Sequence, residues 1–154
     1  MEGDTPDTAV MQRAMHVKPV DMNEGIIRFF RKRPEVVAVY LFGSRAQGRA
    51  KEISDVDLAI LLDPEAAVDS SKLKRELLIS LSRILRKEIH LVILNLAGEM
   101  LTAQIFQYGR CLYNANPHTL SRFRTTQFSR IADFNYLRKI MEKGFTRKIM
   151  EGAL

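Results

Sequence analysis

The fold of this 154-residue chain follows most directly from the stretch VVAVYLFGSRAQGRAKEISDVDLAILL at positions 36–62. Positions 36–42 form an apolar run rich in β-branched and aromatic residues, a pattern that predicts a buried strand. The run stops at Gly43-Ser44, and a second apolar run over 55–62 predicts another buried strand. Because the polar link between them is too short for an ordinary parallel crossover helix, we expect some antiparallel pairing.

Helices and further strands are expected on either side of this stretch. They are a helix over 24–32 capped by Asn23, a helix over 71–86, a strand over 89–94, a helix over 99–108 ending at Gly109, a short strand over 111–113, and a helix over 118–150. This alternation predicts an α/β (α+β) fold, in which a small mixed sheet is flanked by helices. We expect a flexible leader over 1–21, a core over 22–115 and a C-terminal helical extension over 116–154 packed on that core.

The composition indicates the class of protein. The chain is 46% hydrophobic and 27% charged, which is typical of a globular protein. The sequence contains neither the apolar run of a signal peptide nor the roughly twenty apolar residues needed to cross a bilayer. The single cysteine, Cys111, excludes an internal disulfide, and we expect it in the core. These features predict a cytoplasmic protein without membrane contact.

The net charge of +6 favours a polyanionic partner, which is a nucleic acid, an acidic protein or the phosphates of a nucleotide. Basic residues are dense in the expected C-terminal helix: Arg122, Arg124, Arg130, Arg138, Lys139, Lys143, Arg147 and Lys148. This helix is a candidate contact for a partner protein or RNA, and a solvated face explains it equally well. Homo-oligomers and hetero-oligomers both remain open.

The turn at Gly43-Ser44 has the chemistry of a phosphate site. Glycine allows the backbone to approach a ligand closely, and free backbone N–H groups with the Ser44 hydroxyl suit phosphate oxygens. Arg45 adds positive charge beside them. The run is not a P-loop, because Arg49-Ala50 stands where that motif has lysine followed by serine or threonine. A glycine that merely ends a strand is the alternative interpretation.

Asp55 and Asp57 form the second part of the pattern. Because side chains alternate along a strand, both carboxylates are expected on the same face. Two like charges at the head of one strand repel each other unless a cation neutralises them. Mg²⁺ commonly takes one or two carboxylates together with substrate phosphates. The sequence therefore predicts a magnesium site next to the phosphate turn, although a capping aspartate and a solvent-facing one are the simpler alternative.

The combined pattern resembles the DNA polymerase beta-like nucleotidyltransferase superfamily. It consists of a strand, then Gly43-Ser44, a spacer, and Asp55-Val56-Asp57 in a second strand. The match is most similar to the minimal nucleotidyltransferase (MNT) group, and it extends from about position 23 to about position 141. The resemblance implies the nucleotidyltransferase fold.

The resemblance also implies a set of ligands and partners. It implies that Asp55 and Asp57 bind two Mg²⁺ ions and act in catalysis. It implies that Gly43 and Ser44, with Arg45 beside them, hold the phosphates of ATP. A hydroxyl group then attacks the α phosphate and pyrophosphate leaves. MNT proteins of this size are typically antitoxins paired with a HEPN ribonuclease toxin, and some transfer AMP to a toxin tyrosine.

His90 departs from the pattern of this family. The family's third carboxylate lies on the third strand, where this chain has His90. Imidazole suits Mg²⁺ poorly, because Mg²⁺ favours hard oxygen ligands. His90 is a candidate catalytic residue as a general base, and Glu88 is a candidate replacement carboxylate if the strand end bends inward. Two other interpretations remain. The protein binds nucleotide but no longer transfers it, or His90 has no functional role.

Three functions fit these residues. The first is an MNT antitoxin that transfers AMP from Mg-ATP to a HEPN toxin. The second is a catalytically weakened, nucleotide-binding antitoxin that neutralises its toxin by forming a complex, and His90 favours it. The third is a small-molecule nucleotidyltransferase that modifies antibiotics. It ranks last, because little chain remains for an acceptor-binding domain.

Overall fold

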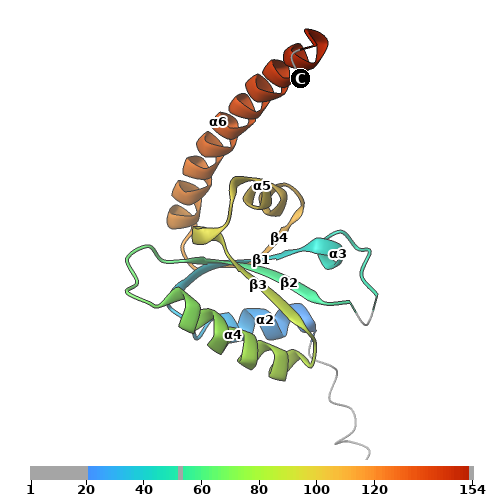
Figure 1. Cartoon of the computed structure of the whole chain (residues 1–154). Coiled ribbons are helices and arrows are strands. Elements are labelled where there is room, and N and C mark those ends of the chain that lie inside the picture. Colours follow the sequence, from blue (N-terminus) through green and yellow to red (C-terminus); the bar gives the residue numbers. More distant parts are fainter. Residues whose placement is uncertain (1–20, 52–53, 153–154) are drawn as a thin grey trace, which may run out of the picture.

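The computed structural model describes residues 21–51 and 54–152 and shows a mixed sheet between two layers of helices (Figure 1). The expected leader therefore lies outside the described residues, apart from Asp21. The elements are α2 (Met22–Phe30), β1 (Val36–Phe42), α3 (Gly43–Ala46), β2 (Val56–Leu62), α4 (Ser70–Leu85), β3 (Ile89–Ile93), η1 (Leu94–Leu96), α5 (Glu99–Tyr108), β4 (Arg110–Asn114) and α6 (Pro117–Met150).

The four strands have the order β3-β2-β1-β4. β1 pairs antiparallel with both β2 and β4, whereas β2 pairs parallel with β3. The mixed sheet and the antiparallel pairing expected from the short link are thus confirmed. α4 supplies the crossover that the parallel pair requires.

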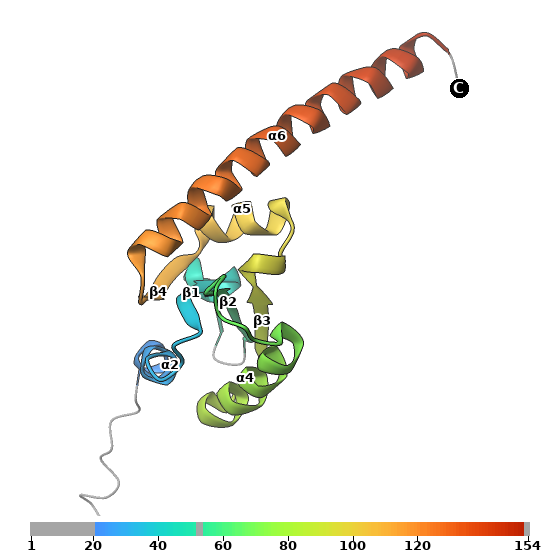
Figure 2. The same ribbon diagram turned by 90° about the vertical axis from the view of Figure 1, so that its left-hand side faces the viewer.

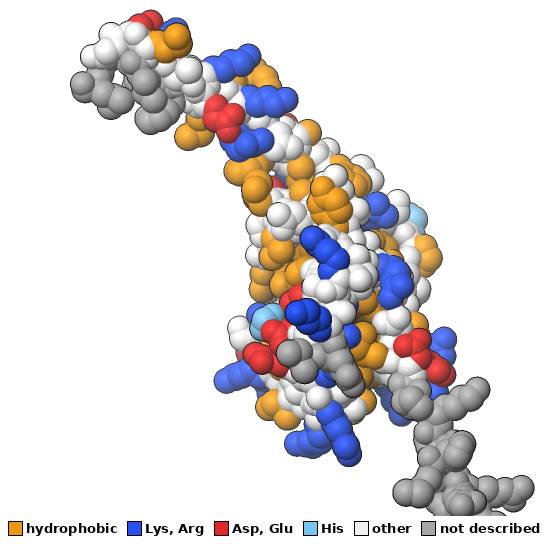
Figure 3. Space-filling view, turned by 90° about the vertical axis from the view of Figure 1, so that its right-hand side faces the viewer, with side chains coloured by type: hydrophobic (Ala, Val, Ile, Leu, Met, Phe, Trp, Pro, Cys, Tyr) orange, Lys and Arg blue, Asp and Glu red, His pale blue; other side chains and the backbone are white. Residues whose placement is uncertain are grey.

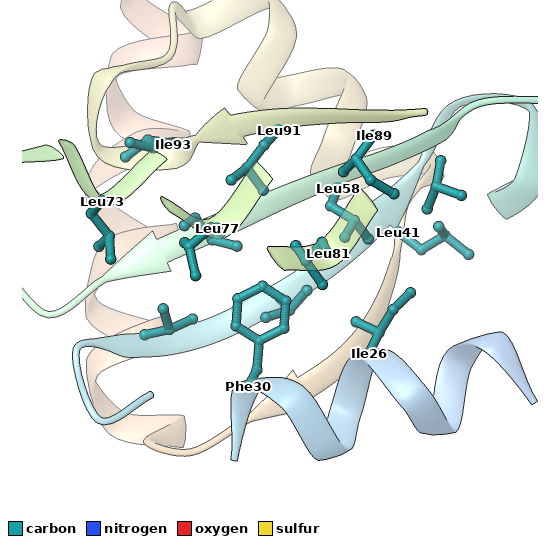
Figure 4. Packing of buried hydrophobic residues seen from close by; sticks show 14 of the residues in the cluster. Ile26, Phe30, Leu41, Leu58, Leu73, Leu77, Leu81, Ile89, Leu91 and Ile93 are labelled. Carbon is teal, nitrogen blue, oxygen red and sulfur yellow. The ribbon is translucent and has the colours of Figure 1, made fainter. Parts of the chain in front are cut away.

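The two faces of the sheet carry separate cores. On one face, α2 and α4 cover the strands, as Figure 2 shows. Ile26 and Phe30 of α2 lie next to Leu73, Leu77 and Leu81 of α4, and both sets pack on the apolar side chains of the strands (Figure 4). α5 and the start of α6 cover the other face, where Tyr40, Ala59, Leu61, Ile105 and Leu120 are buried. Burial on both faces explains why β1 and β2 are nearly continuous apolar runs.

The helix expected over 99–108 is confirmed, since α5 ends at Tyr108 with Gly109 as its C-cap; a Cβ at Gly109 would meet the carbonyl oxygens of Ile105 and Leu41. Three other local expectations are corrected by the structure. The cap of α2 is Asp21, whose side chain accepts a hydrogen bond from the backbone N–H of Asn23. β2 begins at Val56, so Asp55 lies in the loop before the strand. Cys111 is exposed on β4, which pairs only with β1.

The long helix α6 contacts the core through its first part only. Leu120 and Gln127 are buried, and the Arg124 guanidinium lies over the rings of Phe106 and Phe128. Farther along, the helix projects away from the sheet and from α5 (Figures 1 and 2). Leu137, Ile140 and Met141 are exposed there.

None of the described helices is both long enough and apolar enough to cross a membrane.

Candidate functional site

The register of the sheet brings the two predicted motifs together. Asp57 of β2 pairs with Phe42 of β1 on one side and with His90 of β3 on the other. Because Gly43 directly follows Phe42, the turn lies beside the Asp57 carboxylate. These side chains are on the face of the sheet that α5 and α6 cover, where Phe42 and Val92 pack. The site lies at the end of the sheet where β1 finishes and β2 begins.

Gly43 is required by both conformation and space. Its φ is +69°, a region that residues with a side chain rarely adopt. A Cβ built at this position would overlap the Oδ2 atom of Asp57. The turn then closes through hydrogen bonds from the Arg49 N–H to the Ser44 carbonyl, at 2.9 Å, and from the Gly48 N–H to the Arg45 carbonyl, at 3.4 Å. The backbone of the turn therefore lies directly against a carboxylate.

The carboxylates of Asp55 and Asp57 converge on the imidazole of His90. Nδ1 of His90 is 3.1 Å from Oδ1 of Asp57, and Nε2 is 3.9 Å from Oδ2 of Asp55. The Asp57 side chain is 23% exposed and that of Asp55 is 45% exposed, so Asp57 is the inner carboxylate of the pair. Both aspartates thus approach the same imidazole, Asp57 from within β2 and Asp55 from the loop before it.

Glu88 is a further member of the cluster. It precedes β3, and its Oε1 atom lies 3.8 Å from Nε2 of His90. Its backbone carbonyl accepts a hydrogen bond from the Val56 N–H at 2.9 Å, which joins the start of β2 to the residue before β3. One ligand atom from each of Asp55, Glu88 and His90 lies within 4.8 Å of the others.

Arg45 holds the loop before β2. Its Nε donates to the carbonyls of Ser54 and Asp55, each at 3.2 Å, and its Nη2 donates to Ser54 at 2.6 Å and to Lys51 at 3.5 Å. The Ser54 hydroxyl in turn accepts a hydrogen bond from the Lys51 N–H at 2.9 Å. From the sequence, Arg45 was expected near the phosphates, and its hydrogen bonds to these carbonyls were not predicted. No local pattern indicates which carbonyls a long side chain will reach.

The carboxylates and the imidazole of this cluster suit a divalent cation, and their chemistry affects which cation is preferred. The carboxylates of Asp55 and Asp57 are the hard oxygen ligands that Mg²⁺ prefers. His90 contributes an imidazole nitrogen to the same cluster, and Mg²⁺ takes this ligand poorly. Asp55 and Asp57 are therefore the residues that would hold Mg²⁺ here.

Two titratable groups near the site are shifted by their surroundings. Burial raises the pKa of Tyr40 above its usual value, and partial burial of the thiol of the largely exposed Cys111 raises its pKa as well. Both shifts keep the groups neutral at physiological pH. A neutral, packed Tyr40 agrees with its place in the second core cluster.

Comparisons with known proteins agree with this geometry. A family model described as polymerase beta, nucleotidyltransferase matches residues 24–118. A structure of a toxin–antitoxin with AMP-PNP contains a chain that is 26% identical, with a TM-score of 0.67, and the match covers 80% of this chain and 98% of that one. No curated protein matches the sequence significantly.

Two further solved structures are less similar in sequence. One is a toxin–antitoxin named MntA–HepT, at 23% identity, a TM-score of 0.62 and coverage of 81% and 97%. The other holds a tri-AMPylated HEPN toxin from Shewanella oneidensis with an MNT antitoxin, at 23% identity, a TM-score of 0.62 and coverage of 81% and 96%. These two likenesses concern the fold.

Proposed function

Because this chain belongs to the polymerase beta nucleotidyltransferase family, we propose that it is an MNT-type antitoxin that transfers AMP from ATP to a partner HEPN toxin. The observation that carries the proposal is the convergence of the Gly43 turn with the carboxylates of Asp55 and Asp57. All of these residues lie within the matched part of the chain. A phosphate-binding turn beside metal-binding carboxylates is the arrangement that nucleotidyl transfer requires.

Each residue has a defined part in this proposal. Gly43 and the Ser44 backbone and hydroxyl bind the β and γ phosphates, and Asp55 and Asp57 hold the magnesium. Mg²⁺, when bound there with ATP, would neutralise the triphosphate and supply the charge stabilisation that nucleotidyl transfer needs. Arg45 holds the backbone of Ser54 and Asp55 through their carbonyls, which positions the Asp55 carboxylate near His90. These residues position the α phosphate rather than react with it.

The transfer is a single displacement at phosphorus. The acceptor hydroxyl oxygen, from a tyrosine of the toxin, forms a bond to the α phosphorus. The bond between that phosphorus and the oxygen bridging to the β phosphate breaks, and pyrophosphate leaves with the electron pair. The hydroxyl proton passes to water. The products are an O-adenylyl tyrosine and pyrophosphate.

The adenine nucleotide and the protein acceptor are supported by separate observations. AMP-PNP is an analogue of ATP, and it is bound in the toxin–antitoxin structure that is 26% identical to this chain. A protein partner is favoured over RNA by α6, whose projecting part exposes Leu137 and Met141 among its basic side chains. A toxin that acts on cellular RNA also places its antitoxin in the cytoplasm.

A second function is favoured by His90. If the imidazole in place of a carboxylate prevents transfer, the chain would still bind nucleotide and would neutralise its toxin by complex formation alone. This binding-only antitoxin needs the partner surface but not the Asp57 carboxylate. Modification of a small molecule ranks below both, because the 26% identical structure is a toxin–antitoxin.

The deciding experiment uses the full chain together with its cognate HEPN toxin. The two proteins are incubated with ATP and Mg²⁺, and the toxin is analysed by intact-mass and peptide mass spectrometry. We expect one or more adenylyl increments on toxin tyrosines, with no increment when EDTA is present. An unmodified toxin that is nevertheless inactive in the complex would refute transfer and support the binding-only antitoxin.

A further inference from the structure

We propose that Asp55, Glu88 and His90 form a cation site that binds Mn²⁺, a first-row transition-metal ion, in preference to Mg²⁺. The inference concerns the metal of the proposed transferase site and in this sense rests on the proposed function. It arises from His90, whose imidazole nitrogen is a ligand that Mg²⁺ takes poorly.

The spacing of the three side chains suits one shared ion. Nε2 of His90 is 3.9 Å from Oδ2 of Asp55 and 3.8 Å from Oε1 of Glu88. These separations are too long for hydrogen bonds. They match ligand atoms that surround a single cation, which lie roughly 3–4 Å apart when each is about 2 Å from the metal. One ligand atom from each of the three side chains thus lies within 4.8 Å of the others, a spacing that a single bound cation would bridge.

Asp57 orients the imidazole for this purpose. With its proton on Nδ1, His90 donates to Oδ1 of Asp57 at 3.1 Å, and the lone pair of Nε2 then points to Asp55 and Glu88. Histidines that bind metals generally donate their other N–H to a carboxylate or carbonyl in this way. The contact is set by the backbone, because Asp57 and His90 are register partners across β2 and β3.

The two carboxylate ligands are also held in place. Arg45 binds the Asp55 carbonyl, and the Glu88 carbonyl accepts from the N–H of Val56. The ligand side chains of Asp55, Glu88 and His90 are 45%, 73% and 57% exposed, so the site is open to ions in solution. On the face drawn in Figure 3, acidic side chains gather around a histidine at the surface.

The imidazole determines which ion is preferred. Mg²⁺ selects oxygen ligands. Mn²⁺ shares this preference for carboxylate oxygen but, as a first-row transition-metal ion, also binds sites that contain nitrogen ligands. A ligating Nε2 also has no lone pair left for a proton. When the ion is bound, His90 therefore acts as a ligand and not as a general base.

The test measures metal binding without nucleotide. The full-length protein is titrated with MnCl₂ and with MgCl₂ by calorimetry, and bound Mn²⁺ is followed by electron paramagnetic resonance. Mn²⁺ is the probe because it has little affinity for the exposed Cys111 thiol. We expect Mn²⁺ to bind more tightly than Mg²⁺, because Mg²⁺ takes the imidazole ligand poorly.

The variant H90D restores an oxygen ligand and should abolish this preference, with weaker Mn²⁺ binding and tighter Mg²⁺ binding. The matched control is H118D, because His118 is exposed on α6 and outside the cluster; it should retain the native ratio. A native protein that binds both ions equally, or an H90D protein with an unchanged ratio, would overturn the proposal. E88Q alters an exposed ligand and should also weaken Mn²⁺ binding, which provides a test if H90D does not fold.

The result is independent of the transfer reaction. A protein that adenylylates its toxin but shows no Mn²⁺ preference would refute this inference and leave the proposed function intact. A protein with a His90-dependent Mn²⁺ preference that transfers no AMP with either ion would refute the proposed transfer and leave the metal site intact.

Discussion

Gly43 and Asp57 lie in direct contact, so that any side chain at Gly43 would overlap the Asp57 carboxylate. The two residues are separated along the chain by the whole 44–56 segment, yet the register of β1 with β2 places them side by side. This contact joins the proposed phosphate turn to the proposed metal ligand. The properties of the site should therefore depend on both residues together.

The contact predicts a specific effect of G43A. Alanine at a φ of +69° is strained by about 1–2 kcal/mol, and its methyl group would also displace Asp57. We expect lower stability in urea unfolding and loss of Mg-ATP binding by calorimetry. G48A is the matched control, because Gly48 has the same φ but a Cβ at that position would meet no atom within 4 Å. Equal loss of nucleotide binding in both variants would contradict the role of the contact.

The Asp57 carboxylate separates the two antitoxin mechanisms. D57N keeps the shape of the side chain and removes its charge, so we expect adenylylation of the toxin to be lost while the protein complex still forms. The measurements are mass spectrometry of the toxin and size-exclusion chromatography of the mixture. If D57N protected cells from the toxin as well as the native chain does, transfer would not be the mechanism of neutralisation.

Arg45 should act on the loop before β2 rather than on nucleotide. R45A removes charge-assisted hydrogen bonds to the carbonyls of Ser54 and Asp55, each of which contributes about 1.5–3 kcal/mol. We expect faster amide hydrogen exchange over 51–55 and weaker divalent-ion binding in the absence of ATP. An exposed residue farther along the same turn provides the control variant R49A. A loss confined to ATP affinity, with native metal binding, would instead support a phosphate contact.

The projecting part of α6 is the expected contact for the toxin. Leu137 is 57% and Met141 73% exposed, and no other described element covers them. L137D and M141D should weaken the complex with the toxin in pull-down and calorimetry, without lowering the melting temperature of the isolated chain. I79D is the matched control, because Ile79 on α4 is similarly exposed at 61%. Equal binding by all three variants would place the toxin elsewhere.

Thr102 predicts a change in stability outside the site. Its side chain is fully buried on α5, and its hydroxyl oxygen has no hydrogen-bond partner among the described residues. T102V replaces an unsatisfied hydroxyl with a methyl group of similar size and should stabilise the fold by about 1 kcal/mol in urea unfolding. T125V removes the satisfied hydroxyl bond to the Ser121 carbonyl on exposed α6 and should give no gain.

Much of the fold could be predicted from local patterns. The apolar runs become β1 and β2 because their sequences suit strands buried on both faces, and the short link between them allows only antiparallel pairing. Asp55 and Asp57 converge because they are two positions apart, although Asp55 lies just before the strand. These outcomes depend on spacing along the chain, which the sequence records directly.

Other features depend on contacts between distant segments. The register of β3 on β2 brings Glu88 and His90 to Asp55. The direction of the Arg45 side chain depends on the position of the Ser54 and Asp55 carbonyls. The apolar periodicity of α6 indicated a helix but not that the sheet would cover only its first part.

The sequence alone determined which side chains we propose for a nucleotide and a metal, because turn chemistry and residue spacing are local properties. Only the tertiary structure decided the surroundings of the His90 imidazole, in which Nδ1 lies near Asp57 and Nε2 lies near Asp55 and Glu88. That arrangement arises from strand pairing and loop packing, which bring together groups that lie far apart in the chain.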